Sequence, residues 1–173
     1  EIWGKSDTVL SIFAGASAEF ALNKAVDWLY FTGKLPSDPL GRLFSTVKYG
    51  KFIVFSPMDK ANASIDALHK IHGNVEQNRG AKIPDWAYRD VLFMLIYYSI
   101  ASYELLERKL TYREKEEVYN VFYRVGLRMG LKELPSSYNE WLLDRAVHLV
   151  EDLKPSKHTV DLFKQYKKHL GSF

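Results

Sequence analysis

The amino-acid sequence predicts an all-α fold, a single-domain bundle of about seven helices over residues 1–173. Three observations predict it. Apolar residues recur at helical spacing between recognisable caps, prolines and glycines. Strand signals are almost absent, because the only β-branched apolar stretch, residues 51–55, continues a helical pattern. A chain of 173 residues with 47% hydrophobic and 26% charged residues also has the length and composition of one compact domain.

Three helices are predicted in the first half of the chain. Ser6 begins a capping sequence, and Gly33 is placed to end the first helix. Asp38-Pro39 and Ser56-Pro57 each combine a capping side chain with a proline at the first helical position. Gly80 interrupts the chain after the third helix. The three helices are expected near residues 8–31, 39–54 and 57–77.

Four further helices are predicted in the second half. Pro84 opens a long apolar helix. Residues 111–114 and 137–140 read as capping boxes, in which a hydroxyl and a carboxylate satisfy each other's orphan backbone donors. Pro155 closes one of the helices that follow, and Gly171 ends the last. The four helices are expected near residues 84–108, 112–129, 138–152 and 158–170.

Composition excludes several classes of protein. The chain has no cysteine, which removes disulfide frameworks, Cys-ligated zinc, iron–sulfur clusters, thiolate-ligated haem and cysteine nucleophiles. Histidine and carboxylates remain as strong metal ligands. The net charge of +3 is too small for a nucleic-acid footprint, so we expect no nucleic-acid partner. Aromatic residues make up 14% of the chain, which suits a flat or apolar ligand but equally plain packing.

The longest uncharged apolar run predicts a buried helix. It covers the 13 residues between Asp90 and Glu104, well short of the roughly 20 residues that span a bilayer. We therefore expect no transmembrane segment in the chain as given. The sequence starts with Glu1 rather than Met and lacks the charged and apolar regions of a signal peptide. A processed chain or a fragment is expected, and a cytoplasmic location is favoured.

One predicted helix carries a histidine within its apolar stripe. That stripe has helical steps of four, three, four and three residues and consists of Ala61, Ile65, Leu68, His72 and Val75. His69 lies about 60° further round, at the edge of the stripe. An inward His72 is either a neutral core histidine bonded to a carbonyl or a ligand to a metal or haem iron, and the spacing leaves both interpretations open.

The preceding helix places polar groups at the border of its apolar face. Arg42 and Thr46 are four residues apart, and Tyr49 and Ile53 continue their stripe. A guanidinium and a hydroxyl in this position suit an anionic or oxygen-bearing ligand. An interhelical salt bridge with a helix-lining threonine is the alternative.

A run of small residues, 14–18, lies inside the first predicted helix. Its glycine costs roughly 1 kcal/mol of helix stability relative to alanine. We therefore expect a close approach there, by a neighbouring helix or by a planar cofactor.

Scattered motifs over most of the chain, from about Val9 onward, carry a family resemblance. They are Asp38-Pro39-Leu40-Gly41-Arg42 with Thr46, Leu68-His69-Lys70-Ile71-His72 with Val75, Ala101-Ser102-Tyr103-Glu104, Gly126 and Leu134-Pro135. In this order they resemble the catalytic-domain family of mpaB and the rubber oxygenases (latex clearing proteins).

The resemblance implies an all-α fold that encloses a pocket for b-type haem. His72 matches the histidine that ligates the iron, with His69 beside it as a second cofactor-binding candidate. Arg42 and Thr46 match the polar pair of the haem pocket, where the arginine would pair with a propionate or polarise dioxygen and the threonine would offer a hydrogen bond. An apolar wall is expected from Phe93, Tyr97 and Tyr98.

The function implied by the resemblance is a haem b-dependent oxygenase that oxidises an apolar, isoprenoid-like or lipid-like substrate with dioxygen. Rubber oxygenases carry a lysine just before the threonine, where this chain has Ser45, and many relatives have a histidine where this chain reads Val-Leu-Phe at residues 91–93. Substrate handling is therefore expected to differ. Two alternatives stay open: a haem or lipid carrier without turnover, and a cofactor-free helical interaction module.

Overall fold

The all-α prediction is confirmed. The computed structural model describes residues 1–31 and 38–170, apart from the side chains of residues 29, 39, 40, 42, 43 and 170. Within these residues the chain forms eight α-helices and one short 3-10 helix, and no strand. They are η1 (Ile2–Gly4), α1 (Ser6–Leu22), α2 (Val26–Phe31), α4 (Pro39–Phe55), α5 (Met58–Arg79), α6 (Asp85–Leu106), α7 (Tyr112–Arg128), α8 (Tyr138–Asp152) and α9 (Lys157–Leu170).

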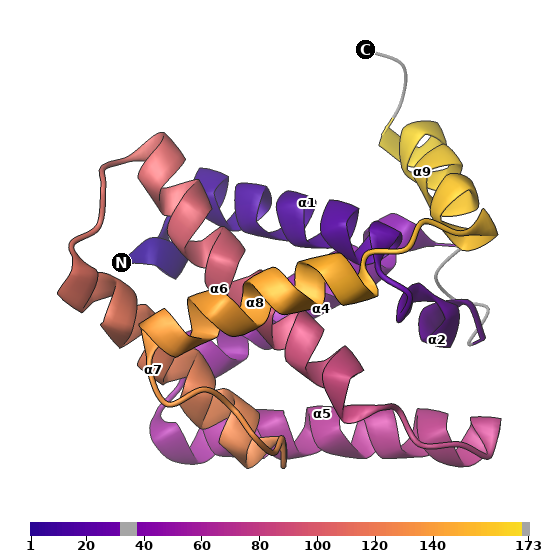
Figure 1. Cartoon of the computed structure of the whole chain (residues 1–173), viewed down its shortest axis with the longest axis horizontal. Helices are drawn as coiled ribbons and strands as arrows, with labels where there is room; N and C mark the ends of the chain where they lie inside the picture. The colour runs from indigo at the N-terminus through magenta and orange to yellow at the C-terminus, as the bar shows by residue number, and fades with distance from the viewer. Residues whose placement is uncertain (32–37, 171–173) are drawn as a thin grey trace.

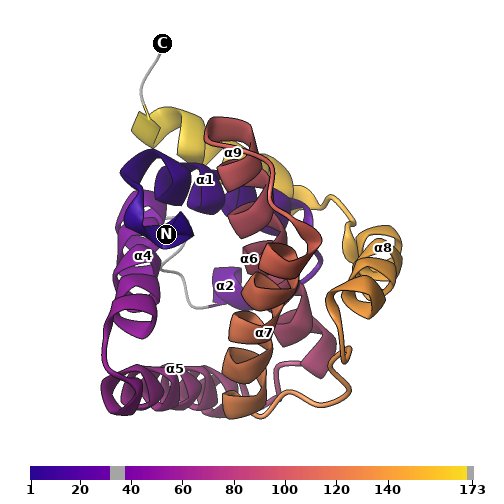
Figure 2. The same cartoon turned by 90° about the vertical axis from the view of Figure 1, so that its left-hand side faces the viewer.

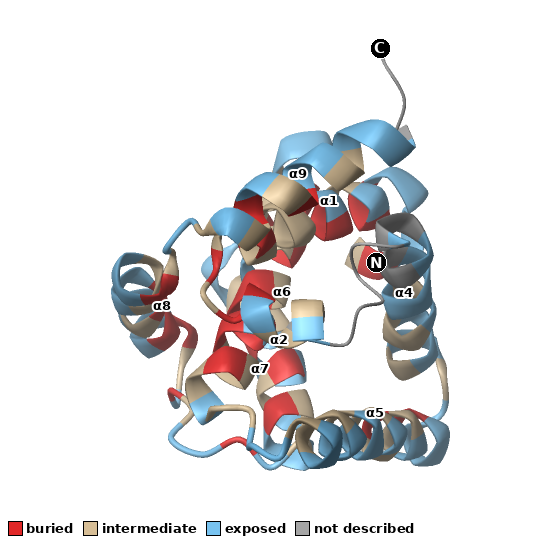
Figure 3. Ribbon diagram, turned by 90° about the vertical axis from the view of Figure 1, so that its right-hand side faces the viewer, coloured by how far each residue is buried: buried red, intermediate tan, exposed pale blue. Residues whose placement is uncertain are grey.

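The long apolar helix α6 forms the centre of the bundle. It packs against α1, α7 and α8, and α8 lies on one side of it while α4 lies on the other (Figure 2). Buried residues concentrate in α1 and α6, whereas α5 and the described side chains of α4 are mostly half-buried or exposed (Figure 3). The bundle therefore has a closed side, around α6 and α8, and a more open side formed by α4 and α5.

The expectation of one helix over residues 8–31 is wrong. The helix ends at Leu22 and a second one starts at Val26, close together on the right of Figure 1. Asn23 causes the break, because its side-chain oxygen accepts a hydrogen bond from the backbone N–H of Ala25 at 2.7 Å. Asparagine competes in this way with the helical pattern of its own backbone. The predicted end at Gly33 lies outside the described residues.

Only one of the two capping boxes forms as expected. At the start of α7, Thr111 and Glu114 make both reciprocal hydrogen bonds. At the start of α8, the Ser137 hydroxyl accepts from the N–H of Glu140 at 3.3 Å, but the Glu140 carboxylate accepts instead from the backbone and hydroxyl of Ser136, each at 2.7 Å. The carboxylate thus caps the loop one residue earlier than a capping box would.

The small residues of α1 allow the close approach of a neighbouring helix. A Cβ atom at Gly15 would lie 2.3 Å from the ring of Tyr98 in α6, well inside van der Waals contact. The sequence left open whether a neighbouring helix or a planar cofactor approaches these residues, and the structure shows a helix, α6. Glycine is needed here because α1 and α6 cross directly at this ring.

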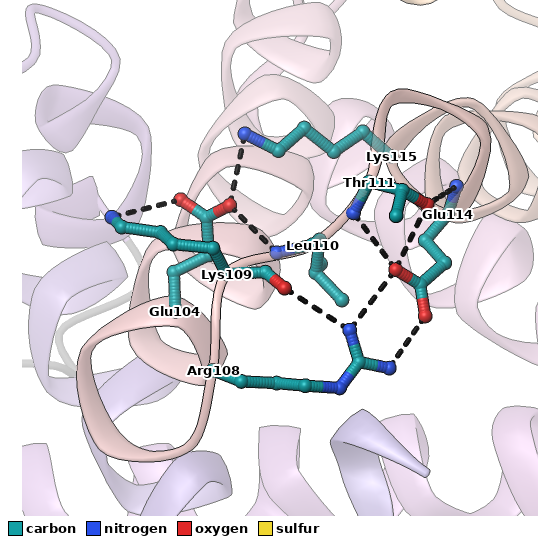
Figure 4. Close-up of polar contacts among 7 residues, drawn as sticks. All are labelled: Glu104, Arg108, Lys109, Leu110, Thr111, Glu114 and Lys115. Carbon is teal, nitrogen blue, oxygen red and sulfur yellow. Dashed lines mark hydrogen bonds and ion pairs between the residues drawn. The ribbon is translucent and has the colours of Figure 1, made fainter.

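The turn between α6 and α7 is held by two carboxylates (Figure 4). Glu104 accepts from the Leu110 N–H at 3.0 Å and pairs with Lys115 at 2.9 Å. Burial alone would raise the pKa of Glu104, but these bonds outweigh it and lower the pKa. Arg108, which pairs with Glu114 at 2.5 Å, lowers the pKa of that carboxylate to about 2. Both groups therefore favour the folded state when ionised.

Replacing Glu104 with glutamine is expected to reduce stability at pH 7 by about 1–2 kcal/mol, because charge-assisted hydrogen bonds are lost. A carboxylate with a lowered pKa contributes its stability above the unfolded pKa of about 4.3 and loses it as the pH falls. Urea titrations from pH 7 to pH 3 should therefore show the difference from wild type shrinking below about pH 4. Glu117→Gln is the control, because its pair with Arg113 is exposed; an equal loss in this variant would contradict the assignment.

None of the described helices combines the length and the apolar character needed to cross a bilayer.

Candidate functional site

His72 lies on α5, in the part of the apolar stripe that the rest of the protein covers only partly. Ala61 and Ile65, at the start of the stripe, are buried. His72 and Val75, further along, are only half-buried. His69, at the edge of the stripe, is exposed. The stripe is thus closed by protein at one end and still accessible where it carries the histidine.

The His72 ring packs against a tyrosine of the neighbouring helix. The ring centroids of His72 and Tyr88 in α6 lie 5.2 Å apart, with the planes at 69°. The Tyr88 hydroxyl donates to Glu76 at 3.3 Å, and Glu76 also accepts from the backbone N–H of Ile83 at 3.0 Å. Burial and, second to it, the Glu76 carboxylate raise the pKa of Tyr88. The tyrosine is held as a neutral donor, and its ring limits how the imidazole can turn.

His69 points to a different environment from His72. It lines a pocket of about 560 Å³ between α5, the start of α6 and the end of α7. Lys70, Glu76, Lys82 and Tyr88 contribute to the same pocket, so much of its lining is polar. This volume lies within the range of about 300–1,000 Å³ that is usual for small-molecule sites. The pocket and the His72 ring share Tyr88 as a common wall.

Thr46 lies on α4 close to the point where that helix meets the core. One turn later, Gly50 approaches Trp3 so closely that a Cβ atom would lie 2.7 Å from the indole ring. Thr46 itself is exposed. The side chain of Arg42 lies outside the described part of the chain. α4 packs directly against α5, so the helices that carry the two predicted groups are neighbours.

The aromatic wall expected from α6 divides between two sides of that helix. Tyr98 packs on Gly15 of α1. Phe93 lies edge-on to Trp141 of α8, with centroids 6.2 Å apart, and the Arg145 guanidinium lies 4.4 Å from the ring centre of Tyr97. Tyr97 follows Tyr88 by nine residues, or about 180° around the helix. The rings of Phe93, Tyr97 and Tyr98 therefore pack toward α1 and α8 and not toward His72. The aromatic residue of α6 that contacts His72 is Tyr88.

A second group of titratable residues lies on the closed side of α6. The Nδ1 atom of His148 contacts one carboxylate oxygen of Asp90 and lies 3.3 Å from an oxygen of Asp152. Asn23 donates to the other oxygen of Asp90 at 2.6 Å, and Lys24 forms an ion pair with the other oxygen of Asp152. We call Asp90, His148 and Asp152 the α6–α8 cluster.

The α6–α8 cluster is buried and electrostatically coupled. The side chains of Asp90 and Asp152 are 3% and 4% exposed. The Asp90 hydrogen bond raises the pKa of His148, against the effect of burial. Burial raises the pKa of Asp90, although hydrogen bonds from His148 and Asn23 oppose it. One ligand atom from each of the three residues lies within 4.8 Å of the other two, a spacing at which they could hold a metal ion.

Sequence reasoning missed this cluster. In the sequence Asp90 only bounds an apolar run, and His148 belongs to no motif that indicates a site. A signal was present, because His148 and Asp152 are four residues apart and so share a helix face. Their meeting with Asp90 depends on the packing of α6 against α8, which helical periodicity does not reveal.

Comparison with known protein families identifies the class as oxygenases. The family described as "ER-bound oxygenase mpaB/B'/Rubber oxygenase, catalytic domain" matches residues 8–170 of the chain. The chain therefore belongs to this family, which confirms the resemblance noted in the motifs around Arg42 and His72. Comparisons with curated proteins and with solved structures gave no match. The matched range includes both the His72 stripe and the α6–α8 cluster.

Proposed function

We propose that this chain is a haem b-dependent oxygenase that oxidises an apolar, isoprenoid-like or lipid-like substrate with dioxygen. The observation that carries the proposal is the placement of His72. In a chain of this oxygenase family, the histidine at the matching motif occupies the one stretch of the α5 stripe that protein leaves half-covered.

The residues around His72 fit a haem. An imidazole is a common axial ligand to haem iron, and the ring of His72 is fixed on one side by Tyr88. Leu68 and Val75, which flank the histidine on the same stripe, keep half-exposed apolar surface. Such surface suits the flat apolar faces of a porphyrin. The adjacent helix α4 supplies Thr46, and by its sequence position Arg42, whose guanidinium would pair with a propionate.

Haem, when bound, supplies the oxygen chemistry; the roles of the chain are ligation, orientation and exclusion of water. His72 would hold the iron, with its ring orientation set by Tyr88. The Glu76 carboxylate accepts a hydrogen bond from the Tyr88 hydroxyl and so fixes the orientation of that ring. Thr46 would donate a hydrogen bond from α4. Ser45 takes the place of the rubber oxygenase lysine, so no amine competes for the iron from this position.

Oxygen uptake on a defined alkene tests the proposal. Haem-loaded protein is supplied with squalene, a linear isoprenoid alkene, under labelled dioxygen. Cleavage of one C=C bond by one dioxygen gives two carbonyl products, each of which should carry one labelled oxygen. Saturated squalane should give no product. Uptake no faster than that of free haemin would contradict an oxygenase of isoprenoid alkenes and favour a haem carrier without turnover.

A further inference from the structure

The α6–α8 cluster has the donor arrangement of a metal site. Oδ1 of Asp90 and Oδ2 of Asp152 face Nδ1 of His148, and one ligand atom from each residue lies within 4.8 Å of the other two. Two ligands at about 2.1 Å from a common cation lie about 3–4 Å apart. The closest approach of Asp152 to the imidazole, 3.3 Å, matches that separation. The Asp152 spacing therefore already fits, whereas Asp90 and the imidazole, now in direct hydrogen-bond contact, would have to move apart to admit the ion.

The outer oxygens of both carboxylates are already held by other groups. Asn23 donates to Oδ2 of Asp90 at 2.6 Å, and Lys24 pairs with Oδ1 of Asp152. This leaves Oδ1 of Asp90 and Oδ2 of Asp152 turned toward His148. Ligating carboxylates in metal sites are oriented by such outer contacts. The arrangement thus has both an inner set of donors and a supporting outer set.

The local charge favours a cation. A bound ion would replace the proton that the His148 Nδ1 shares with Asp90 and release it to solvent. With the imidazole then neutral, Asp90 and Asp152 contribute two negative charges, and Lys24 offsets one of them. Arg89 is the other nearby cation, and it pairs with Asp85 at 3.4 Å. Buried carboxylates without full compensation are costly, so an ion between them removes an electrostatic penalty as well as gaining three ligands.

We propose that Asp90, His148 and Asp152 bind one divalent cation of the Mn²⁺ to Zn²⁺ series as a structural clamp. The mixed nitrogen and oxygen donors suit these metals. The two carboxylates are almost fully buried and the Phe93 ring lies 5.2 Å from the imidazole centre, so the ion would hold helices together, with water completing its coordination. The ion would join α8 to α6, and through Asn23 and Lys24 to the corner between α1 and α2.

This clamp is independent of the proposed haem. Its ligands come from α6 and α8, whereas α4 and α5 carry Thr46 and His72, and α8 lies on the opposite side of α6 from α4 (Figure 2). A failure of haem binding would therefore leave the metal proposal intact, and a failure of metal binding would leave the haem proposal intact.

Titration of EDTA-stripped protein with Mn²⁺, followed by the electron paramagnetic resonance of free Mn²⁺, tests the clamp. We expect one ion per chain, and at a hundredfold excess over Kd a rise in Tm of about 5–10 °C. Asp152→Asn and His148→Gln should each weaken binding at least tenfold, while haemin binding is unchanged. Asp66→Asn, which removes an exposed carboxylate paired with Arg128, should bind like wild type.

The proposal is overturned if wild-type protein takes up no ion with one-to-one stoichiometry, or if both cluster variants bind as tightly as wild type. Proton NMR of the wild-type histidines keeps the test decisive where a variant does not fold. Bound Mn²⁺ should broaden the His148 imidazole signals before those of His69 and His72. Broadening that starts at another of the five histidines would contradict the assignment.

Discussion

Replacing Arg145 with alanine is expected to lower the free energy of unfolding by about 3–5 kcal/mol. Arg145 of α8 forms two parallel hydrogen bonds to Glu19 of α1, at 3.1 and 2.7 Å. The two side chains are only 7% and 9% exposed. Truncation would leave the Glu19 carboxylate buried without its counter-charge. A chain of this length should lose about 6–20 °C in Tm, measured by circular dichroism.

A double substitution separates the charge effect from lost packing. Glu19→Gln combined with Arg145→Met removes both charges and keeps most of the side-chain volume, so it should recover a large part of the stability lost in Arg145→Ala. The matched control is Arg113→Ala, since Arg113 pairs with an exposed glutamate. If Arg145→Ala and Arg113→Ala lower the free energy of unfolding equally, the buried Arg145–Glu19 pair contributes no more stability than an exposed pair.

Replacing Trp141 with alanine is expected to cost a similar amount, about 3–5 kcal/mol, through the cavity that it leaves. Trp141 is 1% exposed. Its ring lies 5.3 Å from that of Tyr138 and 6.4 Å from that of Tyr119, centre to centre. This indole anchors α8 on α6 and α7. Urea unfolding followed by circular dichroism measures the loss.

Trp141→Phe should cost much less than Trp141→Ala. The indole Nε1 finds no hydrogen-bond partner within the described part of the chain, so phenylalanine removes no bond and leaves a smaller cavity. If the two variants lose equal stability, the contribution of Trp141 does not come from ring packing.

Much of the fold was predictable because its signals are local. Thr111 and Asp38 accept the capping hydrogen bonds expected of them, and Gly80 ends α5 in the left-handed conformation. The break at Asn23 was missed because it arises from a side-chain bond to Ala25 together with a long-range bond to Asp90. The helical spacing of apolar residues carries no information about either hydrogen bond.

The candidate site was predictable in part. The spacing placed His72 inside the α5 stripe and His69 at its edge, whereas the structure has His72 half-buried and not in the core, and His69 exposed. The same spacing could not predict the contact between the rings of His72 and Tyr88, because that contact joins two helices. The α6–α8 cluster was missed for the same physical reason. Residues that share one helix face can be predicted from sequence, whereas residues that meet between helices depend on packing.

The absorption spectrum of haemin-reconstituted protein tests the central claim, that His72 holds the haem iron. Wild-type protein should acquire a Soret band at one equivalent of haemin. His72→Ala should lose the band, and His69→Ala, a histidine only three residues away, should keep it. A Soret band that is unchanged in His72→Ala, or that disappears in His69→Ala instead, would contradict the account.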